Sequence, residues 1–166
     1  PLDGAALALR AAAKLALGRY SEAAEDCDEA LVLEPRDAFS MSVRGGAMVG
    51  LGFLKQARRD LDAALALQPS EAFALLMRGV ALRGQGLVAP ASADLEQSLA
   101  AEPEDGLAHL NRAQLLLEQG RPKEALQDFD AALGVDPENG QALIMRAAVA
   151  HQLSVGQPPY GGGAGT

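Results

Sequence analysis

Few residues of this chain could act as a nucleophile, a general base or a metal ligand. Cys27 is the single cysteine, and His109 and His151 are the two histidines. Catalysis needs such groups within reach of one another. However, His151 has no acidic residue one helical turn away, and neither histidine stands at a metal-ligand spacing from Cys27. We therefore predict no catalytic residue, no metal site, no cofactor and no small-molecule substrate.

A different chemistry is suggested by an arginine inside an apolar segment. Arg78 is the only charged residue of LLMRGVAL, residues 75–82. An arginine inside an apolar helix can belong to an active site, bind a ligand or form a structural ion pair. Each of these roles predicts a different function. The surrounding sequence helps to decide between them, because the same arrangement recurs along the chain.

The sequence repeats with a period of 34 residues. Five residue types hold fixed places in the repeat: Pro35, Pro69, Pro103 and Pro137; Gly18, Gly52, Gly86 and Gly120; Ala23, Ala57, Ala91 and Ala125; Arg10, Arg44, Arg78, Arg112 and Arg146; Asp26, Asp60, Asp94 and Asp128. Such a period is typical of a stacked array in which each unit buries its faces only against its neighbours.

Each repeat predicts two helices joined by tight turns. Ala125, Asp128 and Phe129 begin the i, i+3, i+4, i+7 spacing of one helix face. The recurring glycine suits a left-handed cap after the first helix, and the recurring proline prevents the second helix from continuing. Good N-caps precede the first helices, namely Asp3, Asp37, Ser70-Glu71, Asp105 and Asn139.

The arginine and aspartate columns predict structural ion pairs that are at least partly buried. Because the helices of a hairpin run antiparallel, the two columns lie at similar heights. The predicted pairs are Arg10 with Asp26, Arg44 with Asp60, Arg78 with Asp94, and Arg112 with Asp128. There are two alternatives. Each arginine could pair with the aspartate of the preceding repeat, so that Arg146 would reach Asp128, or the arginines and aspartates could form a shared network.

Three further features of the pattern have their own interpretations. The acidic residues two places after each aspartate predict a solvated convex face or, alternatively, an acidic strip for a basic partner; they are Asp28, Asp62, Glu96 and Asp130. Cys27 occupies the place that Leu61 and Leu95 hold, so we predict a buried, inert thiol. His109 occupies the place of Leu75, which predicts a packed core residue.

The pattern resembles the tetratricopeptide repeat family. The resemblance rests on Gly79, Ala91, Ser98 and Pro103 in the third unit and on Gly45, Ala57, Ala64 and Pro69 in the second. It implies an all-α, right-handed α-solenoid of antiparallel helix pairs over residues 1–153. The expected repeats are about 4–37, 38–71, 72–105 and 106–139, with a capping helix at 140–153. Residues 154–166, rich in Pro and Gly, are expected to form a flexible tail or linker.

The resemblance also implies a binding surface, because the first helices of these proteins line a concave groove that holds the ligand. The implied lining is mostly apolar: Leu9, Phe39, Val43, Phe73, Leu76, Met77, Leu107, Leu110, Asn111, Gln114, Ile144 and Met145. An apolar lining favours an apolar or amphipathic segment of another protein as the ligand. The alternative is that neighbouring side chains or other regions of this protein cover these residues.

Two ligand modes of the family lack their residues here. Members that bind chaperone tails hold a terminal carboxylate with Lys and Asn on successive first helices. Asn111 matches one such position, but Leu76, Gln141 and Met145 stand where basic residues are needed. The asparagine ladder of the long sugar-transferase solenoids is represented by Asn111 alone.

The composition excludes other classes of partner. Fourteen basic and twenty-two acidic residues give a net charge of −8, so no nucleic-acid partner is expected. The apolar runs are too short for a membrane span, and the single cysteine favours an intracellular, cytoplasmic protein, with an organelle as the alternative. Because the chain begins with Pro1, we expect it to be part of a longer or processed polypeptide.

Together these features predict a function. We expect a non-catalytic protein–protein interaction scaffold that binds an apolar or amphipathic peptide segment in its concave groove. A structural subunit of a large multiprotein assembly is the alternative.

Overall fold

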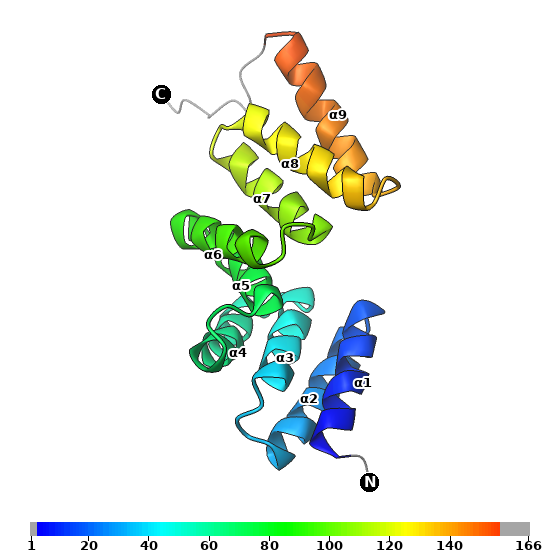
Figure 1. The fold of residues 1–166 in the computed structure, drawn as a ribbon, viewed down its shortest axis with the longest axis vertical. Coiled ribbons are helices and arrows are strands. Elements are labelled where there is room, and N and C mark those ends of the chain that lie inside the picture. The colour runs from blue at the N-terminus through cyan, green and yellow to red at the C-terminus, as the bar shows by residue number, and fades with distance from the viewer. Residues whose placement is uncertain (1–2, 157–166) are drawn as a thin grey trace. The chain divides into compact units, whose positions relative to one another are not determined.

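The computed structural model describes residues 3–156, and within them the chain forms nine helices and no strand (Figure 1). This confirms the all-helical prediction. The first helices of the repeats are α1 (Gly4–Ala16), α3 (Ala38–Gly50), α5 (Ala72–Gly84), α7 (Gly106–Glu118) and α9 (Gly140–Ser154). The second helices are α2 (Tyr20–Leu33), α4 (Leu54–Leu67), α6 (Val88–Ala101) and α8 (Pro122–Val135). Each second helix packs along the first helix that precedes it.

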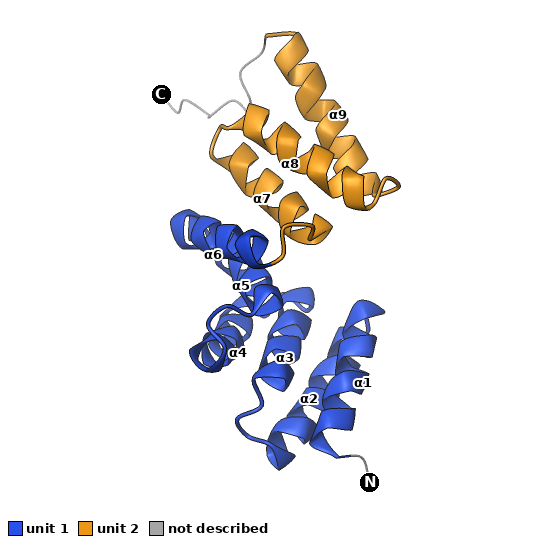
Figure 2. Ribbon diagram, viewed as in Figure 1, with its two compact units in different colours: residues 1–101 blue, residues 102–166 orange. Residues whose placement is uncertain are grey.

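The chain divides into two compact units, residues 1–101 and residues 102–166 (Figure 2). In the first unit, α3 packs against α1, α2, α4 and α5. In the second unit, α8 packs against both α7 and α9. A first helix inside the array therefore has neighbours on several sides, whereas α9 packs mainly against α8.

Polar side chains start the first helices, as the sequence predicts. The carboxylates of Asp3, Asp37 and Asp105 accept hydrogen bonds from backbone N–H groups in the first turn of the following helix. In the third repeat the cap is Glu71, which accepts from Phe73 and Ala74 at 3.1 and 2.6 Å. These bonds satisfy N–H groups that have no partner inside the helix.

A glycine in the left-handed region follows each first helix. The φ angles are 73° at Gly18, 80° at Gly52, 75° at Gly86 and 72° at Gly120. An L side chain adopts such angles at a cost that glycine does not have. The predicted caps are thus confirmed, and they turn the chain sharply enough for the second helix to return along the first.

Small residues let the paired helices approach closely. A Cβ atom at Gly45 would lie 2.5 Å from Cγ of Leu61, and one at Gly79 would lie 3.0 Å from Cγ of Leu95. The apolar side chain of the second helix therefore fills the space that the missing side chain leaves. In the second unit the same place is filled by Phe129, which is fully buried against α7 and α9 residues such as Leu116 and Ala142.

The last helix and the end of the chain complete the described structure. Helix α9 continues to Ser154, one residue past the expected end of the capping helix. Most of the predicted flexible tail, residues 157–166, lies outside the described residues. Within residues 3–156, no helix combines the length and the apolar character needed to cross a bilayer.

Candidate functional site

The arginines of the first helices bind the aspartates of the second helices of their own repeats through two hydrogen bonds each. Nε and Nη2 of Arg44 donate to Asp60 at 2.7 Å each, and those of Arg78 donate to Asp94 at 2.7 and 2.8 Å. The other two pairs, Arg10 with Asp26 and Arg112 with Asp128, have the same geometry, with distances of 2.7–2.8 Å. This is the bidentate fork that suits a guanidinium and a carboxylate.

The remaining nitrogen of the fork reaches back to the preceding repeat. Nη1 of Arg44 donates to Asp28 at 2.7 Å, and Nη1 of Arg78 donates to Asp62 at 2.9 Å. The outer acidic column is exposed, but at these places it also binds arginine, so it is more than a solvated face. One guanidinium thereby connects three helices of two successive repeats.

The arginine of α9 binds a different aspartate from the one that the sequence analysis considered. Arg146 donates to Asp130, on the outer acidic column, and not to Asp128. Asp128 is already occupied, because it accepts from Arg112 and lies 2.9 Å from Nδ1 of His109. Both oxygens of this buried carboxylate are therefore engaged by residues of α7.

The protonation chemistry of these groups fits a structural role. Hydrogen bonds from Arg10 lower the pKa of the Asp26 carboxyl, and a contact of 2.6 Å with Lys14 adds to the effect. Hydrogen bonds to Asp60 raise the pKa of Arg44, and those to Asp94 raise the pKa of Arg78. Each of these arginines is thus held against a carboxylate of the second helix of its own repeat, as a structural ion pair requires.

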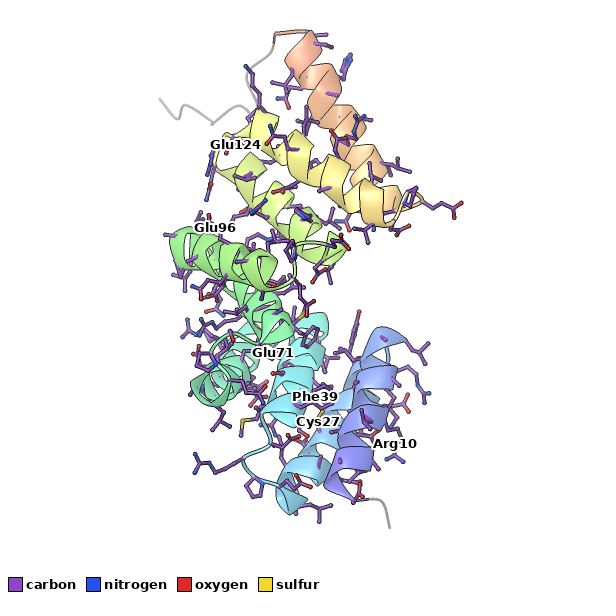
Figure 3. All side chains as sticks on the ribbon, viewed as in Figure 1. Arg10, Cys27, Phe39, Glu71, Glu96 and Glu124 are labelled. Carbon is purple, nitrogen blue, oxygen red and sulfur yellow. The ribbon has the colours of Figure 1, made fainter. Side chains whose placement is uncertain are left out.

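The two residues with nucleophilic or metal-binding chemistry in the interior are also engaged structurally. Cys27 is fully buried, and burial raises the pKa of its thiol to about 12. His109 lies between helices: its Nδ1 is 2.9 Å from Asp128 and its Nε2 is 2.9 Å from the carbonyl oxygen of Pro103. Figure 3 places Cys27 in the first unit, remote in sequence from both histidines.

Five of the residues expected to line a groove are buried in the structure. They are Val43, Leu76, Met77, Leu110 and Asn111. The amide of Asn111 is used internally, since it donates to the carbonyl oxygen of Leu107 at 2.8 Å. The first helices are rich in Gly and Ala, so neighbouring helices approach closely and cover these side chains. These five side chains therefore offer little accessible surface to a ligand, as the alternative of burial by neighbouring side chains expects.

Three further residues of the expected lining, Phe73, Gln114 and Met145, are half-buried. A Cβ atom at Gly46 would lie 2.9 Å from Cζ of Phe73, so the ring packs directly onto the glycine of the preceding first helix. The ring remains partly exposed. Gln114 and Met145 are likewise half-buried, and the amide of Gln114 lies 3.6 Å from the sulfur of Met145.

The rest of the expected lining is open to solvent. In the first unit, Leu9 on α1 and Phe39 on the adjacent α3 are 66% and 44% exposed. In the second unit, Leu107 on α7 and Ile144 on α9 are exposed as well. Figure 3 labels Phe39 on α3, in the middle of the first unit. These four apolar side chains are the most exposed part of the predicted surface.

One exposed apolar residue was missed by sequence reasoning. Leu143 on α9 holds the place in the repeat where Leu75 is buried, yet its side chain is 46% exposed. Among residues 3–156, no second helix follows α9 to cover this side chain. A position in the repeat predicts burial only where the covering helix is present.

Comparisons with known proteins agree with this architecture. The tetratricopeptide repeat model matches residues 47–91, 85–142 and 113–154. A solved structure of TTC0263, a thermophilic TPR protein from Thermus thermophilus, is 30% identical and superposes with a TM-score of 0.73, covering 93% of this chain and 83% of that one. No curated protein matches this sequence.

Two more distant structures share the fold. The Cut9 and Hcn1 hetero-tetramer of the APC/C gives a TM-score of 0.79 at 19% identity, covering 89% of this chain and 30% of that one. The first TPR of Spaghetti (RPAP3), bound to the HSP90 peptide SRMEEVD, gives 0.66 at 18% identity, covering 70% of this chain and 93% of that one. Both likenesses show a common architecture of helical pairs.

Proposed function

This chain belongs to the tetratricopeptide repeat family, and on that premise we propose that it binds an apolar or amphipathic peptide of another protein on its first helices. The fold itself is that of a protein–protein interaction scaffold, and members of the family are generally non-catalytic interaction modules. The observation that carries the finer proposal is the exposure of Leu9 and Phe39 on neighbouring first helices of one compact unit.

The exposure of these side chains is costly unless something covers them. Burial of apolar surface stabilises a protein or a complex by about 25 cal/mol for each Å² removed from water. The exposed parts of the phenylalanine ring and the leucine side chain do not contribute this free energy until a partner covers them. Phe73, partly exposed on the next first helix, extends the surface along the first unit. Leu107, Gln114, Ile144 and Met145 are the corresponding accessible or half-buried residues of the second unit.

The chemistry of the surface selects an apolar ligand. The ion pairs use the arginines of the first helices, so those cations are engaged inside the array. The TPR of Spaghetti holds an HSP90 peptide, but here Leu76 is buried and Met145 is half-buried where a carboxylate clamp needs cations. We therefore propose side-chain burial, and not capture of a terminal carboxylate, as the source of affinity.

A peptide selection on the purified protein tests this proposal. Sequences enriched by phage display on residues 1–166 should be apolar or amphipathic, and they should lose roughly tenfold or more in affinity for Leu9→Glu and Phe39→Glu. Glutamate is suitable at these two places because they are exposed, whereas at the buried Met77 it would unfold the protein before it reported on binding.

The matched control is Val32→Glu. Val32 is an apolar residue of a second helix in the same unit and is 79% exposed, so the same charge is added away from the first helices. Equal loss of binding in this variant, or no loss in Phe39→Glu, contradicts the proposed surface. Unchanged thermal melting of all three variants shows that any effect is on binding.

A structural role in a larger assembly is the second candidate. It is favoured by the exposed apolar residues of α9, a helix with few neighbours within the described chain. Cut9, with the same fold, is part of a hetero-tetramer. Cross-linking from Ile144 to a stoichiometric partner in the native complex would support this role, and recovery of the protein only as a free monomer would contradict it.

A further inference from the structure

The face of α9 that points away from α8 has no covering helix within the described residues. Ala142 and Val149 are buried against α8, but Leu143 and Ile144 are 46% and 72% exposed, and Ala147 is exposed too. In the preceding repeat, Ala113 holds the place of Ala147 and Leu110 that of Ile144, and both are buried. Ala113 and Leu110 are covered because their helix, α7, is followed by a second helix, α8, and has further neighbours. Helix α9 has no such second helix within the described residues.

The second helices show what kind of segment fits such a face. All four contain Ala-x-x-Asp-Φ, where Φ is an apolar residue, and a further small residue three places after Φ. The segments are Ala23 to Ala30, Ala57 to Ala64, Ala91 to Ser98 and Ala125 to Ala132. In each, the aspartate binds the arginine of the first helix, and Φ is fully buried against that helix.

The first helices, which contact the Asp-Φ pair, also share a pattern, and α9 has the same pattern. Each arginine is followed directly by a small residue, and Φ packs on that residue, as Leu61 does on Gly45. Arg146 and Ala147 repeat this arrangement on α9. Helix α9 thus keeps the arginine and the small residue that meet the Asp-Φ pair in the other repeats.

The arginine on this face has no aspartate from a second helix of its own repeat within the described residues. Arg146 is 46% exposed and binds Asp130, which belongs to the outer acidic column of the preceding repeat. The place sixteen residues after Arg146, where each other repeat has its aspartate, is Gly162, and residues 147–166 contain neither Asp nor Glu. The carboxylate that completes the fork must therefore come from outside this stretch.

We propose that α9 binds an amphipathic helix of a partner protein that carries the Ala-x-x-Asp-Φ pattern. The aspartate of that helix forms a bidentate pair with Arg146, and Φ packs on Ala147 beside Leu143, so that the incoming helix takes the place of a second helix. A second copy of this chain does not supply it, because Asp26, Asp60, Asp94 and Asp128 are all bound within their own repeats. This site lies on the second unit and does not depend on Leu9 or Phe39.

A peptide copied from the protein's own α8, residues 122–135, is the probe. Its sequence, PKEALQDFDAALGV, contains the required pattern, and a side-chain bridge between exposed positions keeps it helical. Titration into intact residues 1–166 should show binding of one peptide. The peptide with Asp128→Arg should bind roughly tenfold or more weakly, and the protein variant Arg146→Glu should weaken the parent peptide and restore the reversed one.

The control is Arg59→Glu, a charge reversal at an exposed arginine of α4. It should change neither affinity by more than about twofold. Absence of binding, or equal binding by Arg146→Glu and the parent protein, overturns the proposal. Sedimentation of the protein as a dimer that the peptide does not dissociate would assign the face to a second copy, and a rise in peptide affinity on removal of residues 157–166 would assign it to the chain's own end. Both outcomes also contradict the proposal.

Discussion

Arg78 and Asp94 are joined by two parallel hydrogen bonds that link the first and second helices of one repeat. Asp94 is buried, whereas the arginine side chain is a quarter exposed. The third nitrogen of the guanidinium binds Asp62 of the preceding repeat. The arginine of this apolar helix is thus a structural connection between helices, and it is repeated with the 34-residue period.

Removal of one member of this pair should be costly. In Asp94→Ala the guanidinium loses its bidentate partner in a partly buried place, and we expect the free energy of unfolding to fall by about 2 kcal/mol. Replacement of both residues by leucine should recover most of this loss, because no charge is then stranded. Urea unfolding measures all three values.

The control for this prediction is Asp62→Ala. It removes the exposed partner from the same arginine, and we expect a loss of about 0.5 kcal/mol or less. If Asp94→Ala is no more destabilising than Asp62→Ala, the pair with Asp94 is not the stronger connection.

Acid should weaken the first repeat through Asp26. The folded-state pKa of this carboxyl is lowered by hydrogen bonds from Arg10. Its contribution is therefore complete above the pKa of an unfolded aspartate, about 3.9, and is lost as the pH falls through the lower folded-state pKa. Urea midpoints from pH 7 to 2 should show the parent protein and Asp26→Asn converging below about pH 4. A difference that stays constant to pH 2 would contradict this interpretation.

Cys27 should react only when the protein opens. Its thiol is fully buried and its pKa is raised to about 12, so the reactive thiolate is scarce at pH 8 and shielded from reagent. Alkylation of the native protein by iodoacetamide should be slower by roughly a hundredfold or more than in 6 M urea. Equal rates in the two conditions, followed by mass spectrometry, would show that the first repeat is open.

Two glycines in helices should respond to alanine in opposite directions. A Cβ at Gly45 would lie 2.5 Å from Leu61, but a Cβ at Gly134 meets no atom within 4 Å. Gly134→Ala should stabilise the protein by up to about 1 kcal/mol, the helix propensity difference. Gly45→Ala should lower the stability by about 1–3 kcal/mol, because overpacking exceeds that gain. Thermal melting separates the two, and a stabilising Gly45→Ala would disprove the close packing.

Much of this architecture follows from the sequence because the repeat fixes it. Residues that recur every 34 positions, such as Arg78 and Gly86, predict one pair of helices per repeat. The structure has a helix, a turn at glycine and a second helix at the predicted places. The pairing of Arg78 with Asp94 also follows, since antiparallel helices bring equivalent places to the same height. Periodicity is a strong signal for what each repeat contains.

The accessible surface was harder to predict, because exposure depends on neighbours that the repeat does not describe. Met77 is buried because Gly and Ala in adjacent helices permit a close approach. Leu143 is exposed because its repeat has no second helix within the described residues. The link from Arg78 to Asp62 depends on the angle between repeats, which a helical wheel does not contain.

The central claim, that a peptide binds over Leu9 and Phe39, is tested most directly by NMR of the protein with labelled Leu and Val methyl groups and Phe rings. Addition of a peptide enriched on residues 1–166 should shift or broaden the signals of Leu9, Phe39 and Phe73 at saturation. The methyl signals of Val32, exposed on α2 of the same unit, should stay unchanged. Perturbation confined to Val32 and the second helices, with Leu9 and Phe39 unaffected by a bound peptide, would contradict the account.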